Sequence, residues 1–340
     1  NISKSEWLSK VEKDLKGKPL ESLNWALNEE IMLSPFAHSE DLKNIPNAIP
    51  NNRTSNQWNI GVRIKVSDLK NANKEALSLL ESGATALCFG FKKTPTHAEL
   101  TELLKDISLE WISTNFKIHQ PSGERITSNF IKIIEEKGEN PREVRCSFQF
   151  KGNDISDIEQ LKNTIEKLPK GQFLTFQSKY EKDPVSELSK TIFEANQALI
   201  QLNEKDIDLK NTHKTIRFSV ELSDNYFLNI AKIRALKLLW QNVLSAWDEG
   251  LKNESPIQVH LTTLTQTEDE NYNKIKATTQ AMAAVIGGAD TLYIHASDEF
   301  KDGKGTDFGQ RIALNIQNLM QLESYMNRVT DPAAGSYFIE

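Results

Sequence analysis

The chain has 340 residues, of which 38% are hydrophobic and 26% are charged, and its net charge is −6 with a pI near 5.7. Both signs of charge are scattered along the chain without a basic stripe, which argues against a nucleic-acid-binding protein. No apolar run approaches the roughly 20 residues of a membrane span, and the first residues lack the hydrophobic segment of a signal peptide. The length suits one large domain with an appendage, or two domains.

The first 58 residues form a segment of their own. Apolar residues recur on one face of a short predicted helix that Gly17 ends, and these are Trp7, Leu8, Val11 and Leu15. An extended stretch with Trp25 and three prolines follows. Such an arm cannot bury itself alone, so it must lie on the rest of its own chain or on another subunit. The pattern leaves both arrangements open.

From Gly61 onwards, apolar and β-branched runs alternate with longer segments of helical period. The strand-like runs cover residues 61–66, 84–91, 109–117, 144–150, 171–178, 215–222, 256–264 and 289–297. Eight strands alternating with eight helices predict a parallel (β/α)8 TIM barrel. A doubly wound open sheet is the alternative, but it would normally carry a glycine-rich turn after its first strand, and this chain has none there.

Two of the predicted helices and the cysteines add detail. The sixth helix, at 226–247, is the longest and most apolar, and the seventh ends on Gly287 and Gly288, a pair suited to a C-cap. Cys88 and Cys146 each lie within an apolar strand-like run. We expect two buried free thiols in a reducing compartment, which indicates the cytoplasm.

Polar residues occupy every second position of several predicted strands, whereas barrel strands are usually apolar on both faces. These residues are Ser113 and Asn115; Ser147 and Gln149; Arg217, Ser219 and Glu221; Gln258, His260 and Thr262; and Thr291, Tyr293 and His295. Because the apolar positions must face the helices, the polar ones face the axis, which predicts a hydrophilic bore. A buried polar group without a partner costs about 1–3 kcal/mol. The polar residues must therefore pair with one another or line a channel for a polar ligand, and both remain open.

Five stretches of the chain resemble the methylmalonyl-CoA mutase family. They are "WLSKVEKDLKGK", "NIAKIRALKLLW", "QAMAAVIGGADTLYIHASDE", "DFGQRIALNIQNLMQLES" and "TDPAAGSYFIE". The resemblance implies a barrel at 59–330 whose axis takes the coenzyme A tail, and adenosylcobalamin-dependent conversion of methylmalonyl-CoA to succinyl-CoA. It also implies that 1–58 is an arm for subunit contact, and that 331–340 starts a linker toward an absent C-terminal cobalamin-binding-like domain. The cobalt-binding Asp-x-His-x-x-Gly motif of that domain does not occur in this sequence.

The substrate-site residues of the family can be compared one by one with the matching positions of this sequence. Gln149, Arg217 and His260 match positions of the family's substrate site, while Thr262 stands where the family has Gln. The family's carboxylate-binding Arg is missing, since there is no Arg between Arg145 and Arg217. Its catalytic His is missing as well, and the segment that carries an active-site Tyr is replaced by residues 51–61. The resemblance thus implies no catalytic residue and a vestigial substrate-binding set of Gln149, Arg217, His260 and Thr262.

This pattern resembles that of a small, non-catalytic mutase subunit. The resemblance then implies a heterodimer with a homologous large catalytic subunit that binds adenosylcobalamin, with no cofactor expected in this chain. It also implies subunit contacts through the arm, at Trp7, Leu8, Val11, Leu15 and Trp25. The alternative is an active mutase-like acyl-CoA isomerase with an altered site.

Two remaining features carry weaker functional signals. His260 and His295 on neighbouring strands are too few ligands for a metal site, so we expect none and regard a metal-dependent barrel hydrolase as remote. The loop at 301–305 leads to Thr306 and Asp307 as expected helix caps. It could cradle a phosphate, but a plain surface loop accounts for its composition as well.

Overall fold

The computed structural model describes residues 2–42, 53–119, 124–150, 158–301, 303 and 305–340. Eight parallel strands form a single sheet in the order β6-β5-β4-β3-β10-β9-β8-β7. Their bounds are β3 (Asn59–Lys65), β4 (Ala86–Phe91), β5 (Ser113–Ile118), β6 (Arg145–Gln149), β7 (Leu174–Ser178), β8 (Ile216–Leu222), β9 (Ile257–Leu261) and β10 (Thr291–Tyr293).

The sheet closes on itself. Between β6 and β7, the amide of Phe148 donates to the carbonyl of Gln172 at 3.0 Å, and the amide of Gln172 donates to the carbonyl of Cys146 at 2.9 Å. β10 pairs with β3, with Leu292 opposite Ile60. The predicted TIM barrel is therefore confirmed, and the open doubly wound sheet is wrong.

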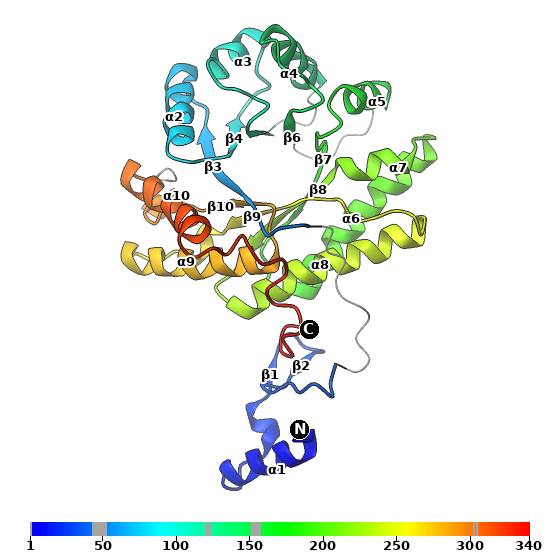
Figure 1. Cartoon of the computed structure of the whole chain (residues 1–340), viewed down its shortest axis with the longest axis vertical. Coiled ribbons are helices and arrows are strands. Elements are labelled where there is room, and N and C mark those ends of the chain that lie inside the picture. The colour runs from blue at the N-terminus through cyan, green and yellow to red at the C-terminus, as the bar shows by residue number, and fades with distance from the viewer. Residues whose placement is uncertain (1, 43–52, 120–123, 151–157, 302, 304) are drawn as a thin grey trace.

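Helices surround the barrel, as Figure 1 shows. Their bounds are α2 (Leu69–Glu81), α3 (His97–Leu103), α4 (Glu124–Glu136), α5 (Ile158–Lys167), α6 (Pro184–Glu204), α7 (Leu209–Thr212), α8 (Tyr226–Trp247), α9 (Glu270–Gly287) and α10 (Asp307–Leu322). Gly288 follows α9 with φ of 87°, so the predicted glycine cap is confirmed. Thr306 caps α10 through its hydroxyl, also as predicted.

The hydrophobic core lies between the strands and the helices. Outward-facing phenylalanines of neighbouring strands stack on one another, with the ring centroids of Phe116 and Phe148 5.2 Å apart, and Phe130 of α4 meets Phe116 edge-on at 5.1 Å. Cys88 and Cys146 are buried free thiols, as expected. This arrangement leaves the other face of each strand, with its polar residues, for the barrel axis.

The N-terminal arm projects away from the barrel in Figure 1. It contains α1 (Lys4–Asp14), a 3-10 turn (Leu20–Leu23), and a short hairpin of β1 (Trp25–Ala26) and β2 (Met32–Leu33). The ring of Trp7 meets that of Phe36 edge-on at 5.2 Å, yet no residue of α1 is buried. The arm touches the barrel through Asn28, whose side chain donates to Asp183 at 3.1 Å.

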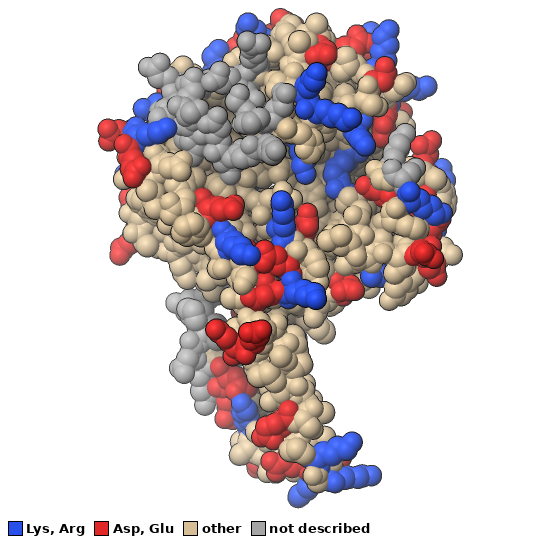
Figure 2. Space-filling model, turned by 180° about the vertical axis from the view of Figure 1, so that it is seen from behind, with Lys and Arg blue, Asp and Glu red and all other residues tan. Residues whose placement is uncertain are grey.

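The C-terminal residues fold back onto α8. Arg234 of α8 forms ion pairs with both Asp331 and Glu340, and the ring of Phe338 lies edge-on to Phe227 at 5.5 Å. Figure 1 shows the C-terminal end close to the hairpin of the arm. Charges of both signs are interspersed over the face seen in Figure 2. None of the helices in the described ranges is long and apolar enough to cross a membrane.

Candidate functional site in the barrel bore

The half of the bore near the N-terminal ends of the strands is filled by polar side chains that bond to one another. Arg217 donates from Nε to the hydroxyl of Thr175 at 2.9 Å and from Nη1 to Oδ1 of Asn115 at 3.0 Å. The hydroxyl of Ser147 donates to the same oxygen, and Asn115 donates to the carbonyl of Leu87 at 3.2 Å. All four polar side chains are buried. This half of the bore therefore takes the self-paired arrangement that the sequence left open.

A cavity of about 420 Å³ opens below this network, at the N-terminal mouth of the barrel. Its wall includes Arg53, Arg145 and Lys170, which are partly neutralised. Arg53 pairs with Asp290 at 3.3 Å, and Lys170 pairs with Glu143 at 2.5 Å. The mouth is thus hydrophilic and carries a small excess of positive charge.

His260 lies further along the axis, against Tyr293. The two rings stack with centroids 4.6 Å apart and an interplanar angle of 4°. The stack fits because residue 61 is glycine, since a Cβ there would lie 2.7 Å from the tyrosine ring. Burial, together with the nearby cations Arg63 and Lys117, lowers the pKa of His260 well below 6.5. His260 is therefore neutral at pH 7, and its Nε2 accepts from the side-chain amide of Gln258 at 3.0 Å.

His295 follows β10 and faces Glu299 rather than His260. Its Nδ1 lies 2.6 Å from a carboxylate oxygen of Glu299. Burial lowers the pKa of His295, as does Arg63, although Glu299 acts in the opposite direction. Within the described ranges, no group of three or more His, Cys, Asp or Glu side chains is arranged to hold a metal ion.

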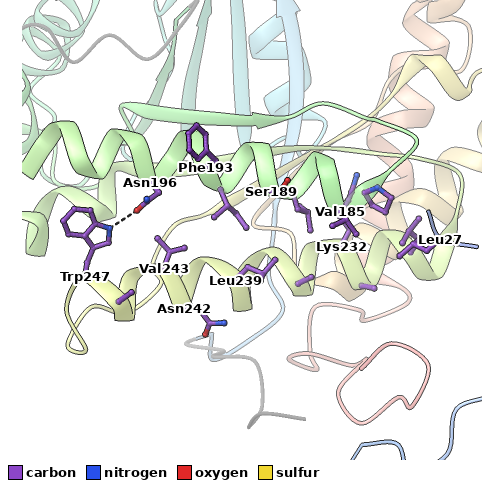
Figure 3. A pocket seen from close by; sticks show the side chains of 17 residues that line it. Leu27, Val185, Ser189, Phe193, Asn196, Lys232, Leu239, Asn242, Val243 and Trp247 are labelled. Carbon is purple, nitrogen blue, oxygen red and sulfur yellow. Dashed lines mark hydrogen bonds between the residues drawn. The ribbon is translucent and has the colours of Figure 1, made fainter. Parts of the chain in front are cut away.

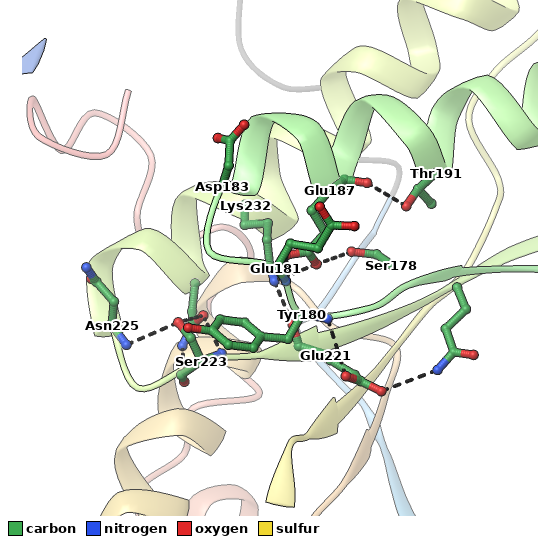
Figure 4. Close-up of polar contacts among 12 residues, drawn as sticks. Ser178, Tyr180, Glu181, Asp183, Glu187, Thr191, Glu221, Ser223, Asn225 and Lys232 are labelled. Carbon is green, nitrogen blue, oxygen red and sulfur yellow. Dashed lines mark hydrogen bonds and ion pairs between the residues drawn. The ribbon is translucent and has the colours of Figure 1, made fainter. Parts of the chain in front are cut away.

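A buried ion pair occupies the C-terminal ends of β7 and β8, as Figure 4 shows. Nζ of Lys232 on α8 lies 2.9 Å from Oε1 of Glu187 on α6, and the two side chains are 4% and 2% exposed. The hydroxyl of Ser178, the last residue of β7, donates to the same carboxylate. Lys232 also donates to the carbonyl of Glu221 at 2.6 Å. These charges are therefore satisfied by one another and by the backbone.

Sequence reasoning missed this ion pair. The available signal was a charged residue on the apolar face of each helix, with Glu187 beside Leu188 and Lys232 beside Ile233. Charged side chains are almost never fully buried unless they are paired. Two such residues 45 positions apart could have been proposed as partners once α6 and α8 were placed side by side.

The four bore residues predicted from the sequence do not form one cluster. Arg217 belongs to the buried network, His260 stacks on Tyr293, and Gln149 ends β6 partly exposed. The hydroxyl of Thr262 accepts from the amide of Leu264 at 3.3 Å and so caps a 3-10 turn (Thr263–Thr265). In the part of the chain that the structure describes, no hydrogen bond joins any two of the four.

An apolar groove of about 1150 Å³ runs between α6 and α8, away from the bore (Figure 3). Phe193 is 63% exposed there, Val185 is 44% exposed and Leu239 is 41% exposed. Leu27 of the arm lines one end of the groove. At the other end, the indole of Trp247 donates to Asn196 at 2.9 Å. The five arm residues predicted to contact another subunit, Trp7, Leu8, Val11, Leu15 and Trp25, all remain partly exposed.

Comparison with known proteins finds similarity to methylmalonyl-CoA mutases. Residues 182–340 match the family model of methylmalonyl-CoA mutase. A methylmalonyl-CoA mutase small subunit from Porphyromonas gingivalis is 29% identical in an alignment that covers 100% of this chain and 60% of that protein. The mitochondrial methylmalonyl-CoA mutase of Homo sapiens is 25% identical over 98% of this chain and 52% of that protein.

A third relative is also named as a small subunit. A probable methylmalonyl-CoA mutase small subunit from Mycobacterium tuberculosis is 32% identical over 46% of this chain and 26% of that protein. The chain spans 60% or less of the length of the curated relatives it matches. The resemblance found in the sequence motifs is therefore confirmed for the barrel portion.

Proposed function

Because the chain is similar to a methylmalonyl-CoA mutase small subunit along its whole length, we propose that it is the barrel portion of a small, non-catalytic subunit of such an enzyme. In this proposal, a homologous large subunit isomerises methylmalonyl-CoA to succinyl-CoA, and this chain supports that subunit in a heterodimer. Residues 1–58 would serve subunit contact, 59–330 form the mutase-type barrel, and 331–340 begin a linker to a further domain.

The ion pair of Glu187 and Lys232 is the observation that carries the proposal. Active sites of TIM barrels lie at the C-terminal ends of the strands, and this pair sits at the ends of β7 and β8. Ser178 and the carbonyl of Glu221 complete its hydrogen bonds. A general acid must reach its substrate with a transferable proton, and groups that satisfy one another inside the fold do not offer one. Arg217 likewise donates to Asn115 and Thr175 inside the bore.

Adenosylcobalamin enters the proposal as a cofactor of the partner subunit. The 340 residues of the chain contain no Asp-x-His-x-x-Gly motif to supply a cobalt ligand. Two free buried cysteines also support a reducing compartment, and we propose the cytoplasm.

The arm and the groove between α6 and α8 are the surfaces we assign to the large subunit. They are continuous, because Leu27 of the arm lines the groove. Three large apolar side chains stand exposed along that groove, which is the composition expected of a buried interface core. A homologous barrel with its own arm is a partner of matching chemistry.

Co-purification with the large homologue tests the proposal. The full-length protein should turn over methylmalonyl-CoA with adenosylcobalamin only when the large subunit is present. Phe193→Asp in the groove should weaken co-purification at least tenfold, because it places a charge in an apolar contact. Trp111→Asp is the matched control, since Trp111 is 81% exposed but lies outside the groove and the arm. Equal loss in both variants, or none in either, would contradict the assigned surface.

The alternative is an active acyl-CoA isomerase with an altered site, and Arg63 is the observation that favours it. Arg63 lies on β3 and lines the C-terminal mouth of the bore, where a substrate carboxylate could meet it. Turnover by the full-length protein without any partner would establish this alternative and exclude the non-catalytic proposal.

A further inference from the structure

A cleft of about 560 Å³ lies between the first and last helices of the barrel, on the outer side of β3. Figure 1 shows α2 and α10 on either side of this strand, and both helices contact it. The wall of the cleft includes three apolar side chains, Val62 of β3, Leu79 of α2 and Leu314 of α10, which pack against one another. We call this site the α2–α10 cleft.

Gln317 of α10 lines the α2–α10 cleft and is buried, with 1% of its surface exposed. Its Oε1 has no hydrogen-bond partner in the part of the chain that the structure describes. By contrast, the buried Gln280 of α9 donates to the carbonyl of Ser223 at 2.8 Å. An unpaired buried polar atom lowers stability, and an apolar side chain of similar shape would avoid that cost. The glutamine therefore indicates a site where a ligand can pair with its amide.

The charged side chains along the more exposed part of the cleft nearly balance one another. Among the described lining residues, Arg63 and Lys65 are basic, and Asp68, Glu75 and Glu299 are acidic. Burial lowers the pKa of Arg63, and the charge of Glu299 acts in the opposite direction. Because both signs of charge are present, this lining favours a neutral ligand over an anion.

We propose that the α2–α10 cleft binds a small neutral carboxamide with an apolar body. The side chain of Gln317 presents an acceptor oxygen and N–H donors in one plane, and the edge of a carboxamide offers the matching donor and acceptor. Two such edges can form a pair of hydrogen bonds, as glutamine does with the edge of adenine. The apolar body would lie against Val62, Leu79 and Leu314. The volume of the cleft is within the range of small-molecule pockets.

This inference goes beyond the proposed role as a small subunit and does not depend on it, since its test needs no partner chain. Benzamide is the probe, titrated into the ¹⁵N-labelled full chain and followed by NMR. We expect saturable binding that shifts the side-chain amide resonances of Gln317, which are the pair absent from the spectrum of Gln317→Met. N,N-dimethylbenzamide has no N–H to donate, and it should bind at least tenfold more weakly. Benzoate carries a negative charge and should also bind at least tenfold more weakly.

The Gln317→Met variant separates binding from stability. Methionine has a similar length but no amide, so benzamide binding should fall at least tenfold while the urea midpoint stays equal or rises. Asn315→Met is the matched control and should leave binding unchanged, because Asn315 is exposed on α10 and does not line the cleft. If Gln317→Met does not fold, Leu79→Phe carries the test, since a larger side chain at this partly exposed position should fill the cleft and weaken binding at least tenfold.

Several results would overturn the proposal. It fails if benzamide does not saturate, or if benzoate or N,N-dimethylbenzamide binds as tightly. It fails equally if Gln317→Met, or Leu79→Phe in its place, binds benzamide like the unchanged protein. A marked loss of stability in Gln317→Met would show that the amide is already paired without a ligand, and this would remove the basis of the inference.

Discussion

Arg217 on β8 and Asn115 on β5 meet across the bore, where the guanidinium donates to the amide oxygen at 3.0 Å. The two strands are separated by β6 and β7 in the ring. The bond therefore spans the barrel rather than joining neighbours. In the resemblance to the mutase family, Arg217 and the bore are features of a substrate channel. In this chain the same arginine joins strands that are not adjacent in the sheet.

Replacement of Arg217 should therefore lower stability. Arg217→Met leaves Asn115 and Thr175 without their donor, and we expect the free energy of unfolding to fall by about 2–4 kcal/mol, since buried hydrogen bonds to charged groups are among the stronger ones. Arg217→Lys keeps the charge but loses the fork, so its effect should be intermediate. Urea denaturation measures both, with exposed Arg142→Met as the control. Unchanged stability in Arg217→Met would mean that the network does not hold the barrel together.

The pair of Glu187 and Lys232 should behave as a coupled unit. Glu187→Gln leaves a buried ammonium without its counter-charge, and Lys232→Met leaves a buried carboxylate. Each should cost about 3–5 kcal/mol of unfolding free energy. The double variant should cost clearly less than the sum, because no unpaired charge remains. Urea denaturation of the four proteins gives the coupling energy, and additive effects would show that the two charges do not depend on each other.

The barrel could be predicted from the sequence because its signal is repeated eight times. Every predicted strand is present, and alternation alone placed Ser147 and Arg217 on the axis and Phe148 and Phe218 toward the helices. The eighth strand illustrates the limit. It was predicted at 289–297 but ends at Tyr293, and His295 beyond it pairs with Glu299. The alternation of polar and apolar residues cannot show where a strand ends when the following loop has a similar composition.

The polar contacts themselves could not be predicted, because they join distant parts of the chain. Arg217 bonds to Asn115, 102 residues earlier, and Lys232 bonds to Glu187, 45 residues earlier. The sequence indicated that the polar groups must be satisfied, and it left open whether they pair with one another or line a channel. The structure contains both, with a paired half near Arg217 and a cavity over β3, β4 and β5.

The two cysteine thiols should be nearly unreactive toward alkylating reagents in the folded protein. Burial raises the pKa of the Cys146 thiol to about 12 and raises that of Cys88 as well, so neither thiolate forms at pH 8. We expect iodoacetamide to modify Cys146 only after unfolding. Cys88, which lines the cavity at the C-terminal ends of β3, β4 and β5, should react slowly in the native protein. Mass spectrometry of native and urea-treated samples measures both, and rapid native alkylation of Cys146 would contradict the packing of β6.

Protonation of His260 should destabilise the fold. Its folded-state pKa lies well below 6.5, chiefly because it is buried and also because Arg63 and Lys117 face it. Below pH 6.5 the unfolded chain therefore binds a proton that the folded chain does not, so the free energy of unfolding must fall as pH falls. Over the interval from pH 6.5 to 5.5 this group should remove about 1 kcal/mol.

His260→Gln should reduce that slope, because it removes the titrating group and keeps a side chain that can bond to Gln258. Urea denaturation at several pH values measures the slope in both proteins. The proton resonances of the His260 ring should also stay at their neutral positions from pH 8 down to 5.5 in the native protein. A ring that titrates near 6.5, with no change of slope in the variant, would place His260 in contact with solvent rather than stacked against Tyr293 inside the bore.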